Sequence, residues 1–332
     1  MRINLSHGSG GKATSNLIRD VFAKRLGNTL LNRQEDAAVL DAGELLPDGG
    51  KLAFTTDSFV VTPLFFQGGD IGRLAVCGTV NDLLCMGARP LCLSAGFILE
   101  EGLSFEDLEK IVISMAAMLE ESGTRLAAAD TKVVEGRGGP YINTSGIGAV
   151  APGIQVGADL MKPGDKIILS GTLGDHHAAI LSRRMEIENN IQSDAAPLNS
   201  LVLPLLEAGL RVHAMRDVTR GGLATVLNEL AVSSGVSLRL YSQCLPVSES
   251  VKALCDILGL DPLYMGNEGK LAIVVDKADA DEALRLILKS PYGLQGALVG
   301  EVTQGSGVYL STETGSLRSL PVLYGEGLPR IC

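Results

Sequence analysis

The sequence lacks the features typical of nucleic-acid-binding and membrane-spanning proteins. It contains no Trp, only 7 Phe and only 6 Tyr, so side chains on which bases could stack are scarce. Acidic residues outnumber basic ones by 38 to 28, and the net charge of −10 disfavours contact with phosphate backbones. No apolar stretch approaches the roughly 18–20 residues that cross a bilayer. We therefore expect no nucleic acid and no membrane among the partners.

Cysteine is also scarce, and its spacing excludes two kinds of site. The six cysteines include no C-x-x-C pair, so the sequence predicts neither a disulfide framework nor a zinc site. Cys77, Cys85 and Cys92 lie in apolar runs, where a thiol behaves as a small hydrophobic group, and we expect them in the core. The N-terminus turns polar and glycine-rich too early for a signal peptide. These observations favour a reduced, cytoplasmic protein.

The length of 332 residues predicts two domains, and the pattern alternates strands with helices in both. Pro- and Gly-rich turns near residues 150–165 mark the boundary. We expect an N-terminal domain over 1–152, a C-terminal domain over 153–315, and a mobile tail over 316–332. Strands are predicted at 51–56, 89–99, 125–135, 142–150, 166–170, 212–215, 236–240, 271–276 and 297–302. Helices are predicted at 12–26, 71–86, 104–123, 174–188, 198–209, 220–234, 247–258 and 279–290. The helix at 104–123 is predicted to open on a capping box at Ser104-Phe105-Glu106-Asp107 and to end near Gly123.

The end of the chain carries no regular pattern after Leu310. Its last twelve residues hold two prolines and two glycines and end on Cys332. Fully extended, such a segment reaches on the order of 40 Å at about 3.3–3.6 Å per residue. Cys332 is therefore a nucleophile that the chain could deliver to a distant site.

Glycine is abundant, at 40 residues, and much of it lies in short loops beside charged residues. The first such loop, from His7 to Lys12, fails the Walker pattern, and too few residues precede it for the first strand of a dinucleotide-binding unit. Two interpretations stay open. Its backbone N–H groups and Lys12 could hold a phosphate, or it could be an ordinary surface loop.

Several aspartates lie at the ends of apolar segments. Asp36 precedes an apolar stretch, Asp57 ends the predicted strand at 51–56, and Asp217 follows the strand at 212–215. Asp82 lies in the predicted helix at 71–86, on a face of apolar or small residues, where an ionised carboxylate requires compensation. A single Asp of this kind is typical of a cap or a turn. Together they favour a Mg²⁺–nucleotide site, because hard cations prefer carboxylate oxygens and bridge to phosphates.

Other polar residues give weaker signals. Asp130 and Lys132 are two apart on a predicted strand and therefore point to the same side. His176 and His177 are adjacent on a helix, about 100° apart, so local structure is the better interpretation of that pair. His213 lies in a strand and indicates a core position or one that supports a neighbouring site.

With these motifs in place, the sequence resembles the HypE hydrogenase maturation factors of the AIR-synthetase (PurM-like) ATP-binding superfamily. The resemblance runs over nearly the whole chain, and the final Pro329-Arg330-Ile331-Cys332 is specific to HypE. The superfamily motifs are Glu35-Asp36-Ala37-Ala38, Thr56-Asp57, Asn81-Asp82, Ala129-Asp130-Thr131-Lys132 and Arg216-Asp217-Val218-Thr219-Arg220-Gly221-Gly222.

The resemblance implies a two-domain α/β (α+β), PurM-like fold. It implies a homodimer whose N-terminal strands form a barrel-like sheet at the interface, with ATP and Mg²⁺ between the domains. The metal would face Asp36, Asp57, Asp82 and Asp217. The nucleotide would contact those first three residues and also Lys12, Asp130, Asn143, Thr144, Ser145 and Gly146.

The resemblance also implies the reaction. The carbamoyltransferase HypF would place a carbamoyl group on Cys332, and ATP would drive dehydration of the S-carboxamide to a thiocyanate. The cyano group would pass to iron on a HypC–HypD complex and become a cyanide ligand of [NiFe]-hydrogenase. Glu268 is implied as the base and Lys132 as a stabiliser of charge, and His7 and Arg330 are further candidates.

Two alternatives stay open. One is another ATP-dependent small-molecule kinase or synthetase of the superfamily. The other is a non-catalytic ATP-binding scaffold for maturation proteins.

Overall fold

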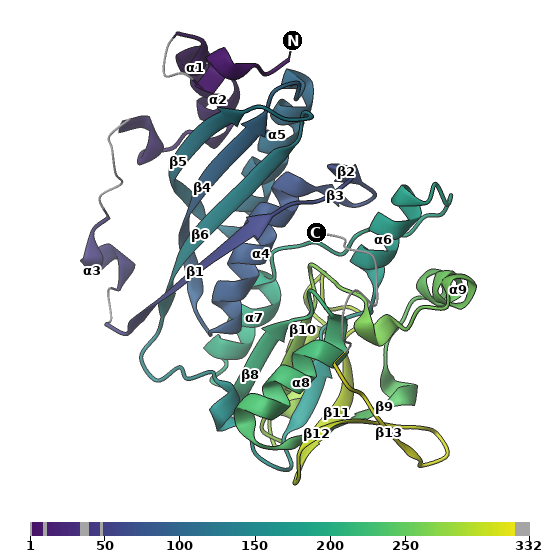
Figure 1. The fold of residues 1–332 in the computed structure, drawn as a ribbon. Helices are drawn as coiled ribbons and strands as arrows, with labels where there is room; N and C mark the ends of the chain where they lie inside the picture. The colour runs from purple at the N-terminus through teal and green to yellow at the C-terminus, as the bar shows by residue number, and fades with distance from the viewer. Residues whose placement is uncertain (1, 9–11, 34–39, 47–48, 323–332) are drawn as a thin grey trace.

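The N-terminal half is built on a four-stranded sheet in the order β1-β6-β4-β5 (Figure 1). The strands are β1 (Lys51–Phe59), β4 (Arg89–Glu100), β5 (Arg125–Val134) and β6 (Pro140–Val150). Only β4 and β5 pair in parallel. Two helices, α4 (Ile71–Cys85) and α5 (Phe105–Ser122), cover one face of this sheet and leave the other face open. The structure is a computed structural model and describes residues 2–8, 12–33, 40–46 and 49–322.

Local sequence signals position both helices. The Asp70 carboxylate accepts from the N–H groups of Gly72 and Arg73, and this bond caps the start of α4. The Ser104 hydroxyl caps α5 in the same way through the Asp107 N–H, as the sequence predicts. Helix α5 ends at Gly123, whose φ of 66° favours glycine. The helical face of each then packs on the sheet.

Smaller elements flank the N-terminal sheet. The predicted helix at 12–26 is confirmed as one helical segment that contains a π-helical turn and packs on α5. The elements are η1 (Leu5–Gly8), α1 (Lys12–Leu17), η2 (Ile18–Ala23), α2 (Lys24–Leu26), η3 (Leu31–Arg33), α3 (Ala42–Leu45) and the hairpin of β2 (Phe65–Phe66) and β3 (Gly69–Asp70).

The C-terminal half is a seven-stranded sheet in the order β13-β12-β9-β11-β7-β10-β8. Its strands are β7 (Lys166–Leu169), β8 (Val212–Asp217), β9 (Ser237–Tyr241), β10 (Leu271–Val275), β11 (Ala297–Thr303), β12 (Gly307–Ser311) and β13 (Leu317–Ser319). The helices are α6 (Asp175–Arg184), α7 (Asn199–Glu207), α8 (Gly222–Ser234), α9 (Glu249–Leu258) and α10 (Ala280–Ile287), with short turns η4 (Ala158–Leu160), η5 (Ser242–Cys244) and η6 (Pro262–Tyr264).

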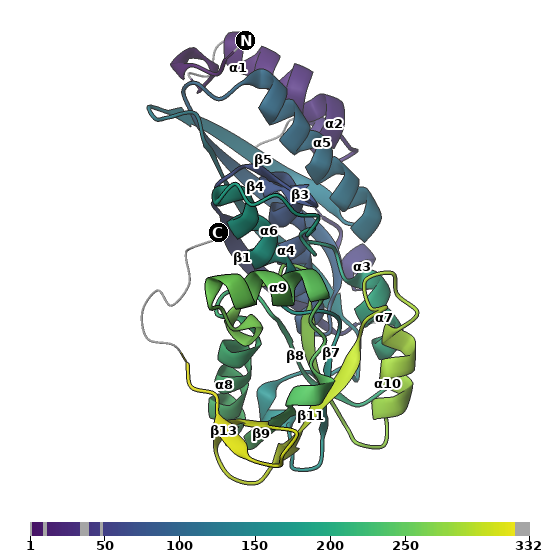
Figure 2. The same ribbon diagram turned by 90° about the vertical axis from the view of Figure 1, so that its right-hand side faces the viewer.

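Helices sandwich this second sheet. Helices α7 and α10 pack on one face and α8 on the other (Figure 2). Every residue of β10 is buried, because the strand lies inside the sheet with helices on both sides. A continuous apolar run such as Leu271–Val275 is the pattern that such a position favours.

Helix α4 connects the two halves. It packs on β1 and β6 above and contacts β8 and α7 below. The same hydrophobic core contains Val80 and Leu84 of α4, Phe97 of β4 and Leu201 of α7. The arrangement therefore carries the Asn81-Asp82 motif of α4 to the junction between the halves.

The predicted elements are present, with one correction. The prediction that regular structure stops after Leu310 is wrong, because β12 continues to Ser311 and pairs with β13. All three residues of β13 are exposed, so its sequence has no apolar alternation from which the strand could be predicted. The predicted tail at 316–332 thus begins in a strand, and its residues 323–332 lie outside the described part. Cys77, Cys85 and Cys92 are buried, as predicted.

No helix in the described part of the chain is both long and apolar enough to cross a membrane.

Candidate functional site

Three of the predicted carboxylates meet around α4. Asp57 lies near the end of β1 on the side that faces α4, and its Oδ2 is 3.7 Å from the position that a Cβ at Gly78 would take. Asp82 lies on α4 one turn after Gly78, and the Thr55 hydroxyl donates to its Oδ2 over 2.8 Å. Asp217 ends β8, the strand beneath α4. The tertiary fold therefore brings together residues from three separate elements.

Burial and mutual repulsion disfavour the ionised forms of these carboxylates. Burial, reinforced by Asp217 and then Asp57, raises the pKa of Asp82 to about 6. The pKa values of Asp57 and Asp217 are also raised, mainly by burial. Arg216 and Arg220 lower these pKa values only in part. A cluster of oxygen donors with this excess of negative charge fits a hard divalent cation such as Mg²⁺.

Some predicted site residues lie outside this description. Asp36, Arg330 and Cys332 are not among the described residues, and Lys12 begins α1 without a described side chain. His7 is described and takes part in local structure. Its Nδ1 accepts from the Asn4 N–H over 3.1 Å, and its ring packs edge-on against Phe105 with centroids 5.2 Å apart.

The open face of the N-terminal sheet carries a second group of predicted residues. Asn143 donates to the Asp57 carbonyl over 2.8 Å, and the Ser145 hydroxyl donates to Thr56 over 3.0 Å. On β5, Lys132 pairs with Asp130 over 2.9 Å. The ion pair is exposed, and it lowers the pKa of Asp130.

The same strand β6 places its alternate residues under α4. Thr144 is fully buried, and its hydroxyl bonds with Thr79 and the Ala75 carbonyl of α4. A Cβ at Gly146 would lie 2.9 Å from the Thr79 methyl, so the helix packs directly on that glycine. The structure therefore does not bring Thr144 and Gly146 to the open face with Asn143 and Ser145.

Glu268 lies at the junction between the halves, in the loop between η6 and β10. It is 8% exposed. The Asn81 side chain of α4 donates to the Glu268 carbonyl over 3.4 Å. Lys132 faces away from α4 on the opposite side of the N-terminal sheet. One chain therefore does not bring Lys132 and Glu268 together.

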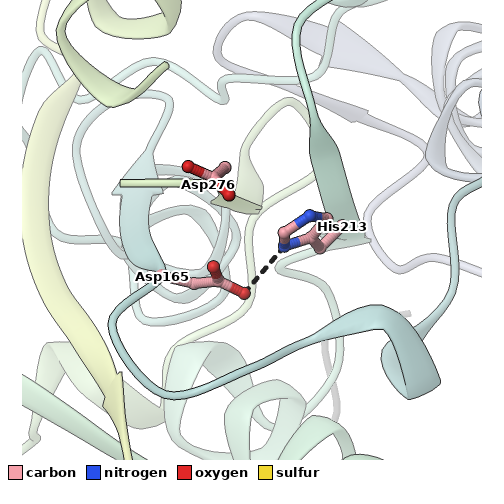
Figure 3. Close-up of side chains that lie close together, drawn as sticks. All are labelled: Asp165, His213 and Asp276. Carbon is pink, nitrogen blue, oxygen red and sulfur yellow. Dashed lines mark hydrogen bonds and ion pairs between the residues drawn. The ribbon is translucent and has the colours of Figure 1, made fainter. Parts of the chain in front are cut away.

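A different trio has the closest metal-ligand spacing among the described residues. Ligand atoms of Asp165, His213 and Asp276 lie within 4.8 Å of one another (Figure 3). The trio lies at the opposite end of β8 from Asp217. Lys162 and Arg211 already pair with Asp276, over 2.9 and 3.3 Å. These cations neutralise Asp276, so we assign the trio a structural role.

The histidines behave as predicted. His213 supports Asp165 through a contact of 2.7 Å between Nδ1 and Oδ2. His176 bonds with the Ser193 hydroxyl over 2.8 Å, and His177 accepts from the Gly266 N–H over 3.4 Å. Burial lowers the pKa of both adjacent histidines to about 4, so they are neutral near pH 7.

The sequence interpretation missed one ion pair at the junction. The Lys270 ammonium lies 3.3 Å from Asp194 Oδ2, and both side chains are largely buried. Lys270 lies two residues after the predicted Glu268, but Asp194 lies in an irregular segment whose residues show no helical or strand periodicity. Only the fold brings these two positions together.

Comparison with known proteins shows the family of the chain. Two protein-family models match the chain, the N-terminal domain of AIR synthase related proteins over residues 34–150 and their C-terminal domain over residues 162–313. The carbamoyl dehydratase HypE of Azotobacter vinelandii is 46% identical over 336 residues, which cover 99% of this chain and 97% of the relative. The chain belongs to the HypE family.

Solved HypE structures share the whole fold. A HypE in complex with ATP superimposes with a TM-score of 0.93 at 43% identity and covers 99% of both chains. A HypE–HypF complex gives a TM-score of 0.80 at 45% identity, over 92% of this chain and 99% of that one. The predicted two-domain PurM-like architecture of the HypE family is therefore confirmed for this chain.

Proposed function

We propose that this protein is an ATP-dependent carbamoyl dehydratase. It converts an S-carbamoyl group on its own Cys332 to a thiocyanate and donates the cyano group to the iron of a [NiFe]-hydrogenase precursor. The observation that carries the proposal is the full-length likeness to relatives named carbamoyl dehydratase HypE. The Pro329–Cys332 motif supplies the thiol that this chemistry needs.

The proposed partners follow from the same likeness. One similar HypE was solved with ATP and another with HypF, which supports ATP as the substrate and HypF as the carbamoyl donor. The acceptor of the cyano group is a HypC–HypD complex in this proposal. The reaction would take place in the cytoplasm.

The chemistry balances with ATP as the dehydrating agent. The amide oxygen attacks the γ-phosphoryl group, ADP leaves, and one N–H proton is lost. The carbon–oxygen bond then breaks, phosphate leaves with the oxygen, and the second N–H proton is removed to form the nitrile. S-carboxamide and ATP thus give thiocyanate, ADP, phosphate and one proton. Glu268 acts as the base for these transfers and Lys132 stabilises the developing charge.

The carboxylates around α4 form the proposed metal side of the site. Asp57, Asp82 and Asp217, with Asp36, would hold Mg²⁺. When bound, this ion would neutralise charge on the transferring phosphoryl group. The Thr55 hydroxyl orients Asp82 from β1. Lys12 and the open-face residues Asp130, Asn143 and Ser145 are the proposed phosphate contacts, and the three open-face residues would reach this site from a second copy of the chain.

A second copy of the chain is proposed to cover the open face of the N-terminal sheet. Large apolar side chains are exposed there on four adjacent strands, with Phe54 71% and Leu52 53% exposed. Ile98, Val134 and Tyr141 extend this face, and contiguous apolar surface of this kind marks an interface. Because Lys132 lies on this face and Glu268 does not, a site that contains both draws Lys132 from the partner copy.

The deciding measurement is the mass of the C-terminal peptide. The protein is incubated with HypF, carbamoyl phosphate and MgATP, with Cys332→Ser as the control. We expect a carbamoyl adduct on Cys332 that loses the mass of one water only when ATP is hydrolysed. ATP hydrolysis with an unmodified Cys332 would instead indicate a small-molecule kinase or synthetase. Nucleotide binding without hydrolysis would indicate a scaffold.

A further inference from the structure

The Asp194 carboxylate holds three consecutive residues of the loop that carries Glu268. Its Oδ1 accepts from the Glu268 N–H over 3.1 Å, and its Oδ2 accepts from the Gly269 N–H over 3.3 Å. The same Oδ2 lies 3.3 Å from the Lys270 ammonium. The Asp194 side chain is only 4% exposed. A carboxylate this deeply buried is stable because these partners compensate its charge.

The backbone of the loop is pressed against the Asp194 segment. A Cβ at Gly269 would lie 1.9 Å from the Asp194 carbonyl oxygen, so only glycine fits there. The stem of Lys270 packs on Gly171, where a Cβ would lie 2.8 Å from the lysine Cε. The Lys270 ammonium is therefore held at Asp194 by packing as well as by charge.

Helix α4 holds the loop from its other side. The Asn81 side chain donates to the Glu268 carbonyl over 3.4 Å and to the Ala196 carbonyl over 3.0 Å. The Glu268 backbone is thus bonded at its N–H by Asp194 and at its carbonyl by Asn81. These two bonds hold the Glu268 backbone in place at the junction between the halves.

We propose that Asp194 is a positioning residue for Glu268, and that the Asp194–Lys270 ion pair sets the charge environment of this base. The proposal rests on the proposed function, in which Glu268 removes the amide protons. Nothing in the sequence motifs marks Asp194 for this role. Its contacts with the N–H groups of the loop and with Lys270 assign it.

The ion pair has a definite electrostatic sign. Removing the Asp194 charge leaves Lys270 uncompensated, which favours ionised Glu268 and moves the acidic limb of the rate profile to lower pH. Removing the Lys270 charge leaves Asp194 unpaired, which moves that limb to higher pH. The other charged or titratable groups around this part of the junction include Asp70, Arg73, Cys77, Glu121, Asp175 and His176, and the last of these interacts with Asp194.

The experiment compares Asp194→Asn with Lys270→Met in the full-length protein. Each variant is carbamoylated on Cys332 by HypF, MgATP is then added, and thiocyanate formation is followed by mass between pH 5.5 and 8.5. We expect Asp194→Asn to slow dehydration about 10- to 100-fold, the range for a catalytic group displaced by about 1 Å. The KM for ATP should stay within about threefold, because binding is not the affected step. The acidic limbs of the two variants should shift in opposite directions.

Asp165→Asn is the matched control. Asp165 is also a buried aspartate of the C-terminal half, accepts from the Lys162 N–H over 2.8 Å and pairs with His213, at the far end of β8. We expect it to lower stability while dehydration stays within about twofold of wild type. Hydrogen exchange of the 266–270 peptide, measured without substrates, should be faster in Asp194→Asn and unchanged in Asp165→Asn.

Three results would overturn the assignment. They are dehydration by Asp194→Asn within twofold of wild type, acidic limbs that shift together in the two variants, and unchanged exchange of the loop. If Asp194→Asn does not fold, the pH–rate profile of Lys270→Met decides. An acidic limb that does not move to higher pH in that variant overturns the assignment. A carbamoylated wild-type chain that forms no thiocyanate with ATP overturns the proposed function itself. In that case Asp194 can no longer be assigned as a positioning residue for a catalytic base. Hydrogen exchange of the 266–270 peptide would still show whether Asp194 orders the loop.

Discussion

The Asn81 side chain forms hydrogen bonds between the two halves, and its replacement by alanine measures how much these bonds contribute to the free energy of unfolding. Its side chain donates to the Ala196 carbonyl over 3.0 Å and to the Glu268 carbonyl over 3.4 Å, and it accepts from the Leu198 N–H over 2.9 Å. The side chain is buried, so no water replaces it easily. Asn81→Ala removes all three bonds and leaves the partner groups buried.

The expected cost follows from this count. A hydrogen bond contributes about 0.5–1.5 kcal/mol net, and an unsatisfied buried partner raises the loss. With two good bonds and one long bond, Asn81→Ala should lower the free energy of unfolding by about 2–4 kcal/mol. Asn81→Asp keeps the bond from Leu198 but sets a carboxylate oxygen against two carbonyls. We expect it to be at least as destabilising.

Urea unfolding at pH 7.5 without nucleotide is the assay, with Asn228→Ala as the matched control. Asn228 donates to the Ala224 and Leu320 carbonyls over 2.7 Å each, and all three residues belong to the C-terminal half. Loss of these two bonds should lower the free energy of unfolding by about 1–3 kcal/mol by the same count. The reasoning is refuted if Asn81→Ala costs less than Asn228→Ala, because the bonds between the halves would then add nothing.

Three further predictions follow from the structure. His176→Gln should reduce the loss of stability on acidification, measured by urea unfolding. Burial lowers the pKa of the His176 ring from 6.5 to about 4. The contribution of this residue to wild-type stability is therefore complete above pH 6.5 and falls toward pH 4, by up to about 3 kcal/mol. An unchanged slope in the variant would contradict it. If the chain forms the proposed dimer, mixtures of Lys132→Met and Glu268→Gln chains should regain part of the dehydration that each variant lacks alone, because one of the two sites in a mixed dimer then has both native residues. No recovery would place both residues in one chain. Gly269→Ala should lower the unfolding free energy by about 3 kcal/mol or more, since its Cβ would lie 1.9 Å from a backbone oxygen. Gly139→Ala, whose Cβ would meet its nearest neighbour at 3.4 Å, should change it by less than about 1 kcal/mol, and equal losses would contradict the reasoning.

Local chemistry made much of the fold predictable. The Ser104 cap and Gly123 bound α5 as predicted, because capping depends on residues within one turn. Apolar periodicity located α4, and the pKa of its Asp82 is raised mainly by burial, in keeping with its predicted position on the apolar face. Strand β13 was missed because three exposed residues carry no such pattern.

The sequence predicted which carboxylates belong to the site, but not how closely they pack. Asp57, Asp82 and Asp217 were found because each interrupts or ends an apolar element. Their raised pKa values, however, depend on how closely β1, α4 and β8 pack. The alternation of β6 already separates Thr144 from Asn143, but which of them faces α4 depends on where that helix packs.

The element order, the caps, the carboxylates at the element ends and the resemblance to HypE could all be predicted from residues that are neighbours along the chain. The contact of Asp194 with residues 268–270, and the positions of Lys132 and Glu268 on opposite sides of the N-terminal sheet, could not. Contacts across 74 residues, such as that between Asp194 and Glu268, follow from how α4 and the two sheets pack. The periodicity of neighbouring residues does not predict that packing.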